Sequence, residues 1–366
     1  MNIESRILKN EETVSLNLRD IYRKYGYSCF KMSKFEEYDL YSRNKDFLVS
    51  DSVITFNDTN GRLMALKPDV TLSIVKNYKP NGGVQRLYYN ENVYRISDKT
   101  HQYKEIMQVG LECMGDVDEY NLYEVIGLAA ESLNTISERC VLNISHLGIL
   151  SAILSPVTSQ ADRAAIIECV SDKNAHGLDE DCERCALTAR SAALLKYLVS
   201  AYGDANEVLD GLTSLTDDGN VIAAADQLRK LAAQLAQSYG SCVRVDLSLV
   251  SDMNYYNGIV FCGFIEGVPS SVLSGGQYDR LMDKMGKEAK AIGFAVYLDM
   301  LERMKEEPPY TVDVLLLYGQ DDDKGGVCRR VAELVAEGKC VSAQTDIPDK
   351  LYYRAIERFN GGAENE

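Results

Sequence analysis

The stretch Ala291-Ile292-Gly293-Phe294-Ala295-Val296-Tyr297-Leu298-Asp299-Met300-Leu301 decides the fold of this 366-residue chain. A glycine, a phenylalanine and an alanine lead into an apolar run, and we expect a helix from about Ile292 to Met304. Five other segments with polar residues precede it, between residues 66 and 279. In this order, the six segments predict one sheet domain that holds a polar pocket.

The overall charge argues against a nucleic-acid-binding protein. The chain has 39 basic and 55 acidic residues, which gives a formal net charge of -16. Affinity for nucleic acids comes mainly from basic residues that neutralise phosphates. Binding of tRNA would need one basic face on an otherwise acidic protein, so we expect no tRNA partner.

Neither a membrane nor a metal is expected. The segment Met1 to Arg6 lacks a basic start followed by an apolar run, and no stretch approaches the roughly eighteen consecutive apolar residues of a spanning helix. We predict a cytoplasmic protein whose ten cysteines are reduced. Cys182 and Cys185 form a CxxC pair, but Cys169 and His176 do not complete a zinc site with familiar spacing. The sequence predicts no metal and no cofactor.

The first part of the chain mixes helical and strand patterns. Apolar residues near helical spacing predict an amphipathic helix over residues 4–25, and a long helix is expected at about 120–136. Strands are expected at 52–56, 62–66, 84–89, 92–96 and 104–114. The Asn-Gly step of Asp58-Thr59-Asn60-Gly61 favours a hairpin between the first two. This mixture indicates an α+β fold rather than a doubly wound parallel sheet.

The middle of the chain, from about 147 to 238, is rich in alanine and leucine and predicts a helical insertion. Strand patterns return at 243–249 and 258–264, so we assign the interrupted sheet domain to residues 1–308. A domain boundary is expected there, because the segment Glu306-Glu307-Pro308-Pro309 is typical of a loop. Residues 309–366 are predicted to form a short α/β segment with a strand at 312–317 and a helix at 326–337.

Two of the six segments carry polar residues that suit a common pocket. Leu66-Lys67-Pro68-Asp69-Val70-Thr71 brings together a carboxylate and a hydroxyl, which suit an ammonium group. Gln108 and Glu112 lie four apart on a predicted strand and share a face with Gly110, which indicates a common pocket. The remaining segments are Arg86 to Arg95, Asn254 to Gly258 and Ser274 to Asp279.

In this order the segments resemble those of the histidyl-tRNA synthetases. Residues 66–71 are similar to that family's Leu-Arg-Pro-Glu-x-Thr, residues 108–112 to its Gln-x-Gly-x-Glu strand, residues 254–258 to its Asp-Tyr-Tyr-Thr-Gly loop, and residues 274–279 to its Ala-Gly-Gly-Arg-Tyr-Asp turn. The resemblance implies a class II aminoacyl-tRNA synthetase-like antiparallel sheet flanked by helices. It also implies that eight residues line the pocket, namely Asp69, Thr71, Arg95, Gln108, Glu112, Tyr255, Tyr256 and Tyr278.

Each of these residues also has a plainer interpretation. Arg95 on a strand would equally serve in a surface ion pair, and Tyr255 and Tyr256 would serve as ordinary packing. Asp69 suits the N-terminus of a helix. Gly275-Gly276 suits a turn that needs positive φ.

Departures from the synthetases concentrate on the chemistry of ATP. Met300 stands where the closing motif of that family has an arginine that clamps the phosphates, and Ser251 stands where another arginine promotes attack on ATP. Ser97 replaces a glutamate near the adenine. Preorganised charge is usually the largest catalytic term, so adenylation is not expected.

Two departures concern assembly and RNA. Phe35-Glu36, at the position of the family's dimer motif, follows Ser33-Lys34 rather than a proline. The tail 309–366 is shorter than the anticodon-binding domain of the synthetases, which has roughly a hundred residues. The dimer and the recognition of tRNA are therefore both in question.

A pocket that keeps contacts to an amino acid and loses contacts to ATP resembles the regulatory subunits of ATP phosphoribosyltransferase. That resemblance implies a subunit without catalytic residues, which forms a homodimer and joins short-form catalytic subunits in a hetero-octamer. It further implies a role in activating the first step of histidine biosynthesis and in feedback inhibition, with histidine as a ligand. Two alternatives stay open: a divergent histidyl-tRNA synthetase that forms histidyl-adenylate and charges tRNA, and a free-standing amino-acid-binding or amino-acid-modifying paralogue.

Overall fold

The computed structural model describes residues 8–48, 53–80, 82–96, 101–250, 253, 255–304, 310–359 and 361–364. The chain forms two compact units, Met1–Met304 and Lys305–Glu366. The first contains a large mixed sheet with flanking helices and a helical segment, and the second is a small α/β unit. The predicted α+β class is confirmed.

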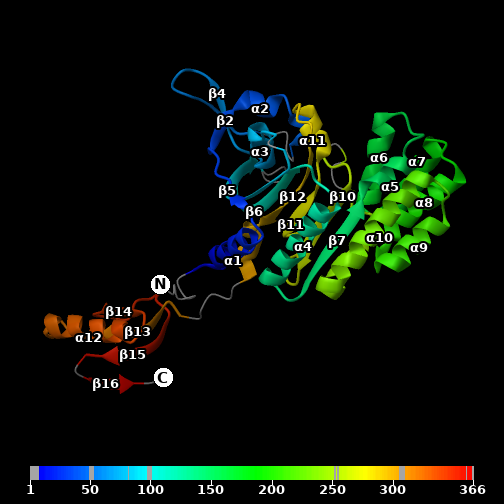
Figure 1. Cartoon of the computed structure of the whole chain (residues 1–366). Helices are drawn as coiled ribbons and strands as arrows, with labels where there is room; N and C mark the ends of the chain where they lie inside the picture. Colours follow the sequence, from blue (N-terminus) through cyan, green and yellow to red (C-terminus); the bar gives the residue numbers. More distant parts are fainter. Residues whose placement is uncertain are drawn as a thin grey trace. The chain divides into compact units, whose positions relative to one another are not determined.

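The central sheet of the first unit has nine strands in the order β1-β5-β6-β12-β11-β10-β7-β9-β8 (Figure 1). Every pairing from β5 through to β7 is antiparallel, whereas β1 and β9 join the sheet by parallel pairing. The strands are β1 (Ser28–Cys29), β5 (Val84–Ile96), β6 (Tyr103–Gly115), β7 (Cys140–His146), β8 (Tyr202–Gly203), β9 (Val243–Asp246), β10 (Ile259–Ile265), β11 (Leu273–Gln277) and β12 (Lys290–Tyr297). The two strands predicted at 84–89 and 92–96 are one continuous strand, β5.

The helix predicted from Ile292 to Met304 is wrong over its first half. Residues 292–297 belong to strand β12, which lies between β6 and β11 near the middle of the sheet. Only Leu298–Met304 (η3) is helical, in the tighter 3₁₀ form. A central strand that is buried on both faces is as continuously apolar as a buried helix, so periodicity does not separate the two.

Two helices cover one face of this sheet. Helix α1 (Asn10–Lys24) lies within the predicted range 4–25, of which residues 4–7 are outside the described residues. Helix α4 (Glu119–Ile136) begins at Asp118, whose side chain accepts a hydrogen bond from the backbone N–H of Asn121. Such a cap satisfies one of the free N–H groups of a helix start. The apolar sides of both helices join the sheet in one large core.

The segment predicted to be helical contains six helices, which gather beside β7 in Figure 1. They are α5 (Leu147–Ile153), α6 (Gln160–Ser171), α7 (Ala175–Arg184), α8 (Ala189–Ser200), α9 (Ala205–Ser214) and α10 (Gly219–Tyr239), followed by the 3₁₀ turn η2 (Gly240–Cys242). The segment also contains one short strand, β8, which pairs with β9 at the edge of the central sheet. After β7 the chain enters the helical segment, touches the edge of the sheet briefly as β8, and then forms β9, which pairs with β7.

A second core covers the other face of the central sheet. It includes the small antiparallel sheet β2-β4-β3 and short helices. These elements are β2 (Phe35–Glu37), α2 (Tyr38–Ser42), η1 (Lys45–Phe47), β3 (Thr55–Asn57), β4 (Leu63–Leu66), α3 (Thr71–Asn77) and α11 (Asp279–Lys284). The predicted hairpin is confirmed, since β3 pairs with β4 and Gly61 takes a φ of 77° in the turn between them.

The second unit holds a four-stranded sheet in the order β14-β13-β15-β16, with one helix. Its elements are β13 (Val312–Leu317), α12 (Lys324–Ala336), β14 (Val341–Gln344), β15 (Tyr353–Arg358) and β16 (Gly361–Glu364). The predicted strand and helix are both present. None of the helices in the described ranges combines the length and the hydropathy that a membrane span requires.

Candidate functional site

One cavity of about 330 Å³ lies on the face of the central sheet opposite α4. Its walls come from the start of α3, from β5, β6, β10, β11 and β12, and from the segment before β10. All eight residues named from the sequence line it: Asp69, Thr71, Arg95, Gln108, Glu112, Tyr255, Tyr256 and Tyr278. The structure therefore brings together residues that are up to about two hundred positions apart.

Strand β6 supplies the floor of the cavity through its alternation of faces. Gln108 and Glu112 point to the cavity, whereas Val109 and Leu111 join the core under α4. Between the two polar residues, Gly110 leaves no room for a side chain, because a Cβ there would overlap with the Tyr89 hydroxyl. The glycine thus lets the ring of Tyr89 lie across the strand.

Glu112 is at the centre of a buried hydrogen-bond network. Its exposed fraction is 2%. The Thr71 hydroxyl donates to Oε1 at 2.7 Å, and the Tyr278 hydroxyl donates to Oε2 at 2.6 Å. Burial raises the pKa of Glu112 to about 8, although both hydrogen bonds act to lower it. The carboxyl is accordingly close to its titration point near neutral pH.

Asp69 and Arg95 form the second polar group of the cavity. Asp69 Oδ1 accepts the backbone N–H of Leu72 at 2.8 Å, so it also satisfies the first turn of α3. Burial raises the pKa of Asp69, and the nearby guanidinium of Arg95 opposes that shift. Arg95 donates through Nε to the carbonyl of Pro68 at 3.0 Å. Asp69 therefore does two things: it accepts a hydrogen bond at the start of α3, and it lines the cavity.

Aromatic rings form the wall that faces these polar groups. The ring centroids of Tyr255 and Tyr256 are 4.6 Å apart, and that of Tyr278 lies 6.0 Å from Tyr255. Phe47, from η1, contacts Tyr255 edge-on at 6.1 Å. Such edge-to-face contacts are favourable and hold the rings in fixed positions. The tyrosines are therefore both packing residues and cavity residues.

The turn expected at Ser274 to Asp279 is a strand that leads into a helix. Gly275 and Gly276 lie in β11 and do not have positive φ values. They are small because the sheet is crowded: a Cβ on Gly276 would come within 2.7 Å of the Tyr256 ring, and one on Gly293 of β12 would overlap with the Glu112 carboxylate. Space, rather than backbone conformation, therefore requires these glycines.

The cavity is lined by more acidic than basic side chains. Among its described lining residues Asp69 and Glu112 are acids, and Arg95 is the one base. A buried carboxylate gains most from a cation that also donates hydrogen bonds. The arrangement suits a small ligand that has an ammonium group for the acids and a carboxylate for Arg95.

Several lining residues were not foreseen from the sequence. They are Phe47, Leu48, Tyr89, Cys262, Ser274 and Tyr297. Ser274 and Tyr297 hydrogen-bond through their hydroxyls at 2.6 Å across β11 and β12. A correct assignment of β12 as a strand would have found Tyr297, since it shares a face with Gly293.

The positions that depart from the synthetases are only partly described. Met300 lies in η3, is 38% exposed, and its sulfur accepts from the Ser270 hydroxyl at 3.5 Å. Ser97, Ser251 and Asn254 lie outside the described residues. Cys182 and Cys185 are in and just after α7, and the described part of the chain holds no group of three potential metal ligands.

Comparison with known proteins gives concordant matches. Residues 4–301 match the family described as histidyl-tRNA synthetase. The ATP phosphoribosyltransferase regulatory subunit of Clostridium kluyveri is 30% identical over 302 residues, which cover 80% of this chain and 77% of that protein. An ATP phosphoribosyltransferase regulatory subunit/histidyl-tRNA synthetase from Bacillus halodurans has a similar structure, with a TM-score of 0.75, 24% identity, and coverage of 95% of this chain and 93% of that one.

A solved complex gives a further structural match. A chain of the ATP phosphoribosyl transferase (HisG:HisZ) complex from Thermotoga maritima superposes with a TM-score of 0.62 and 18% identity, covering 79% of this chain and 97% of that chain. At these identities the structural matches establish the shared fold.

Proposed function

Because this chain belongs to the histidyl-tRNA synthetase family, and within it to the regulatory subunits of ATP phosphoribosyltransferase, we propose that it activates the catalytic subunit of that enzyme and mediates inhibition by histidine. The chain is a non-catalytic subunit of an enzyme that acts in histidine biosynthesis.

The observation that carries the proposal is the composition of the cavity. It retains two acids, one arginine and a tyrosine wall, which suit an amino acid. Met300 brings neither charge nor hydrogen-bond donor to the position where the synthetases have a phosphate-clamping arginine. A cavity of about 330 Å³ is at the small end of ligand sites, which favours one amino acid over an amino acid with a nucleotide.

We propose that histidine is the ligand and that all eight residues contact or position it. The ammonium group would lie near Glu112, Asp69 and Thr71. The carboxylate would face Arg95 with Gln108 beside it. The imidazole would lie against Tyr255 and Tyr256, with Tyr278 holding the Glu112 carboxyl in place at 2.6 Å.

The proposed partner is the short-form catalytic subunit, in a hetero-octamer. The solved HisG:HisZ complex from Thermotoga maritima, which contains a chain of this fold, supports a hetero-complex. The tail of this chain is a small α/β unit in which Asp321, Asp322 and Asp323 precede α12. An acidic tail of this kind supports the view that tRNA is not a partner.

We also propose a homodimer that uses the small sheet β2-β4-β3. Phe35, Phe56 and Leu63 expose 48%, 38% and 46% of their surface there, and the two phenylalanine rings are 5.3 Å apart. Exposed apolar clusters of this kind mark interaction surfaces. Sedimentation of a Phe35→Asp variant should show a shift to monomer, whereas Val335→Asp in the second unit should not.

The deciding experiment measures formation of phosphoribosyl-ATP from ATP and phosphoribosyl pyrophosphate by the short-form catalytic subunit. The assay is run without this chain, with it, and with added histidine. We expect activation that histidine reverses. A lack of activation, together with no complex on a sizing column, would overturn the proposal.

Two further measurements separate the alternatives. A divergent synthetase would exchange pyrophosphate into ATP in the presence of histidine, and we expect no exchange. Calorimetry should show that histidine binds to the pure chain with release of protons at pH 7, because an ammonium group beside Glu112 would ionise a carboxyl whose pKa is about 8. Glu112→Gln should remove that release, and equal proton release by both proteins would contradict the proposed pose.

A further inference from the structure

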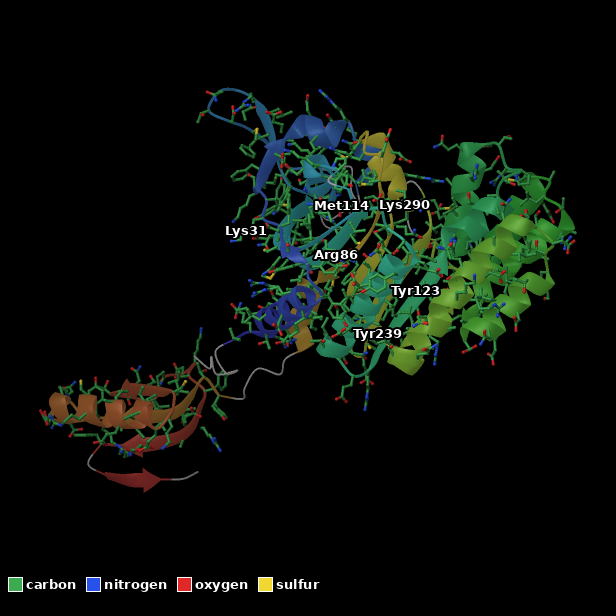
Figure 2. All side chains as sticks on the ribbon, in the orientation of Figure 1. Lys31, Arg86, Met114, Tyr123, Tyr239 and Lys290 are labelled. Atoms are coloured by element: carbon green, nitrogen blue, oxygen red, sulfur yellow. The ribbon has the colours of Figure 1, made fainter. Side chains whose placement is uncertain are left out.

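The stem of the helical insertion contains two thiols in direct contact. Cys140 begins β7, and Cys242 ends the 3₁₀ turn η2 that follows α10. Their sulfur atoms are 3.2 Å apart, although the residues are 102 positions apart in the chain. Figure 2 labels Tyr239 at the end of α10, just before that turn. The pair thus connects the start of β7, which precedes the helical insertion, with the turn that leads from the insertion into β9.

The surroundings of the pair make one sulfur accessible and the other nucleophilic. Cys140 is partly exposed, whereas Cys242 is 8% exposed. The shared hydrogen bond from Cys140 lowers the pKa of Cys242, and the backbone N–H of Leu142 and the charge of Arg244 act in the same direction against burial. A thiolate is the form that attacks a disulfide. The outer cysteine can thus meet a small oxidant while the inner one attacks the product.

We propose that Cys140 and Cys242 are a reversible modification site, which a small disulfide such as glutathione disulfide oxidises to an intramolecular cross-link. The hydrogen bond with Cys242 and burial raise the pKa of Cys140, so Cys140 attacks the oxidant only as it passes its proton to the Cys242 sulfur 3.2 Å away. A mixed disulfide forms on Cys140, and the first glutathione leaves as a thiol that takes this proton from Cys242. The Cys242 thiolate then attacks the Cys140 sulfur and expels the second glutathione. Two protein thiols are oxidised, one disulfide is reduced to two thiols, and each thiol proton ends on glutathione.

The cross-link would tie together both ends of the helical insertion. Next to the pair, Leu142 of β7 and Val243 of β9 are already partners in the sheet, so little movement is needed to shorten the sulfur contact to a bond. The bond would close a long loop that contains α5 to α10, and closing long loops restricts the unfolded chain most. In reducing surroundings the pair rests as a dithiol and responds when glutathione becomes oxidised.

The test uses the full chain in glutathione buffers of increasing oxidised fraction, followed by acid quenching, alkylation of free thiols and trypsin digestion. Cleavage after Arg139 and Arg163 and after Lys230 and Arg244 gives peptides 140–163 and 231–244, each with one cysteine. The linked pair of these peptides should appear at a lower oxidised fraction than any other cross-link. If both peptides stay fully alkylated after other cysteines have reacted, the proposal fails.

Matched variants separate the pair from general oxidation. Cys140→Ser and Cys242→Ser should each abolish the linked peptide, whereas Cys185→Ser, which alters the CxxC pair in and after α7, should leave it unchanged. The oxidised chain should unfold at a higher temperature than the reduced chain, and that shift should vanish in Cys140→Ser and in Cys140→Ala. A cross-link that forms without any shift would overturn the claim that it ties the insertion together.

Discussion

From Gln108 onward, the two faces of strand β6 are equally buried, but only one of them carries polar side chains. Leu111 and Cys113 are fully buried in the apolar core under α4, and Gln108 and Glu112 on the other face are only 3% and 2% exposed. Burial of a polar group costs free energy unless hydrogen bonds replace the lost water. The difference indicates that one face of the strand serves stability, whereas the other sacrifices stability to hold a binding cavity.

The largest effect is expected on the apolar face. Leu111→Ala removes a side chain with no exposed surface and leaves a cavity in the core. We expect a loss of about 2–5 kcal/mol in the free energy of unfolding, as for other buried leucines. Urea denaturation measures it, and histidine affinity of the folded fraction should be unchanged. A loss below 1 kcal/mol would show that this face is not the stabilising one.

On the cavity face, replacing the buried Glu112 side chain by a neutral one should raise the free energy of unfolding at neutral pH rather than lower it. Glu112 has a pKa of about 8 in the folded chain and 4.5 as the reference for the unfolded chain, so the folded state alone holds the proton between these values. Stability therefore falls as pH rises from 4.5 to 8, by about 3 kcal/mol at pH 7.

Glu112→Gln keeps a neutral side chain of the same shape and should remove this pH dependence. The variant should be more stable than the parent at pH 7 and equal to it near pH 4. Denaturation midpoints at several pH values measure the difference. Parallel pH profiles for both proteins would show that Glu112 is ionised in the folded chain.

The third expectation concerns crowding on the cavity face, where Gly293 of β12 lies opposite Glu112. Gly293→Ala would push a methyl group into the Glu112 carboxylate, so the carboxyl must move from Thr71 and Tyr278. Overpacking of this kind costs about 1–3 kcal/mol. Histidine binding should weaken as well. Gly219→Ala, at an open position in α10, is the matched control and should be close to neutral.

The eight pocket residues were predicted through the resemblance to the histidyl-tRNA synthetases, and the structure places them around one cavity. Gln108 and Glu112 reveal their shared face through spacing alone, and the structure brings them together as expected. Strand β12 was mistaken for a helix, since a run buried on both faces has neither a period of two nor of 3.6.

Contacts between segments that are distant in the chain do not follow from residue spacing. Cys140 and Cys242 meet only because β7 and β9 pair after a long insertion. Phe47 reaches Tyr255 from a short 3₁₀ turn that no pattern marks. Spacing identifies which residues share an element, whereas packing decides which elements meet.

The smallest expected effect on stability comes from the Thr71 hydroxyl, which is buried but donates a hydrogen bond to Glu112. Thr71→Val keeps the shape of the side chain and removes the 2.7 Å hydrogen bond to Glu112, which should cost about 1 kcal/mol and raise the pKa of Glu112 further. The converse change, Val109→Thr, puts a hydroxyl on the fully buried apolar face of β6 and should cost about 1–3 kcal/mol without altering histidine affinity. Calorimetric titration and denaturation of both variants compare the faces directly. Equal weakening of histidine binding by Val109→Thr and by Thr71→Val would contradict the view that one face of β6 stabilises the fold and the other binds the ligand.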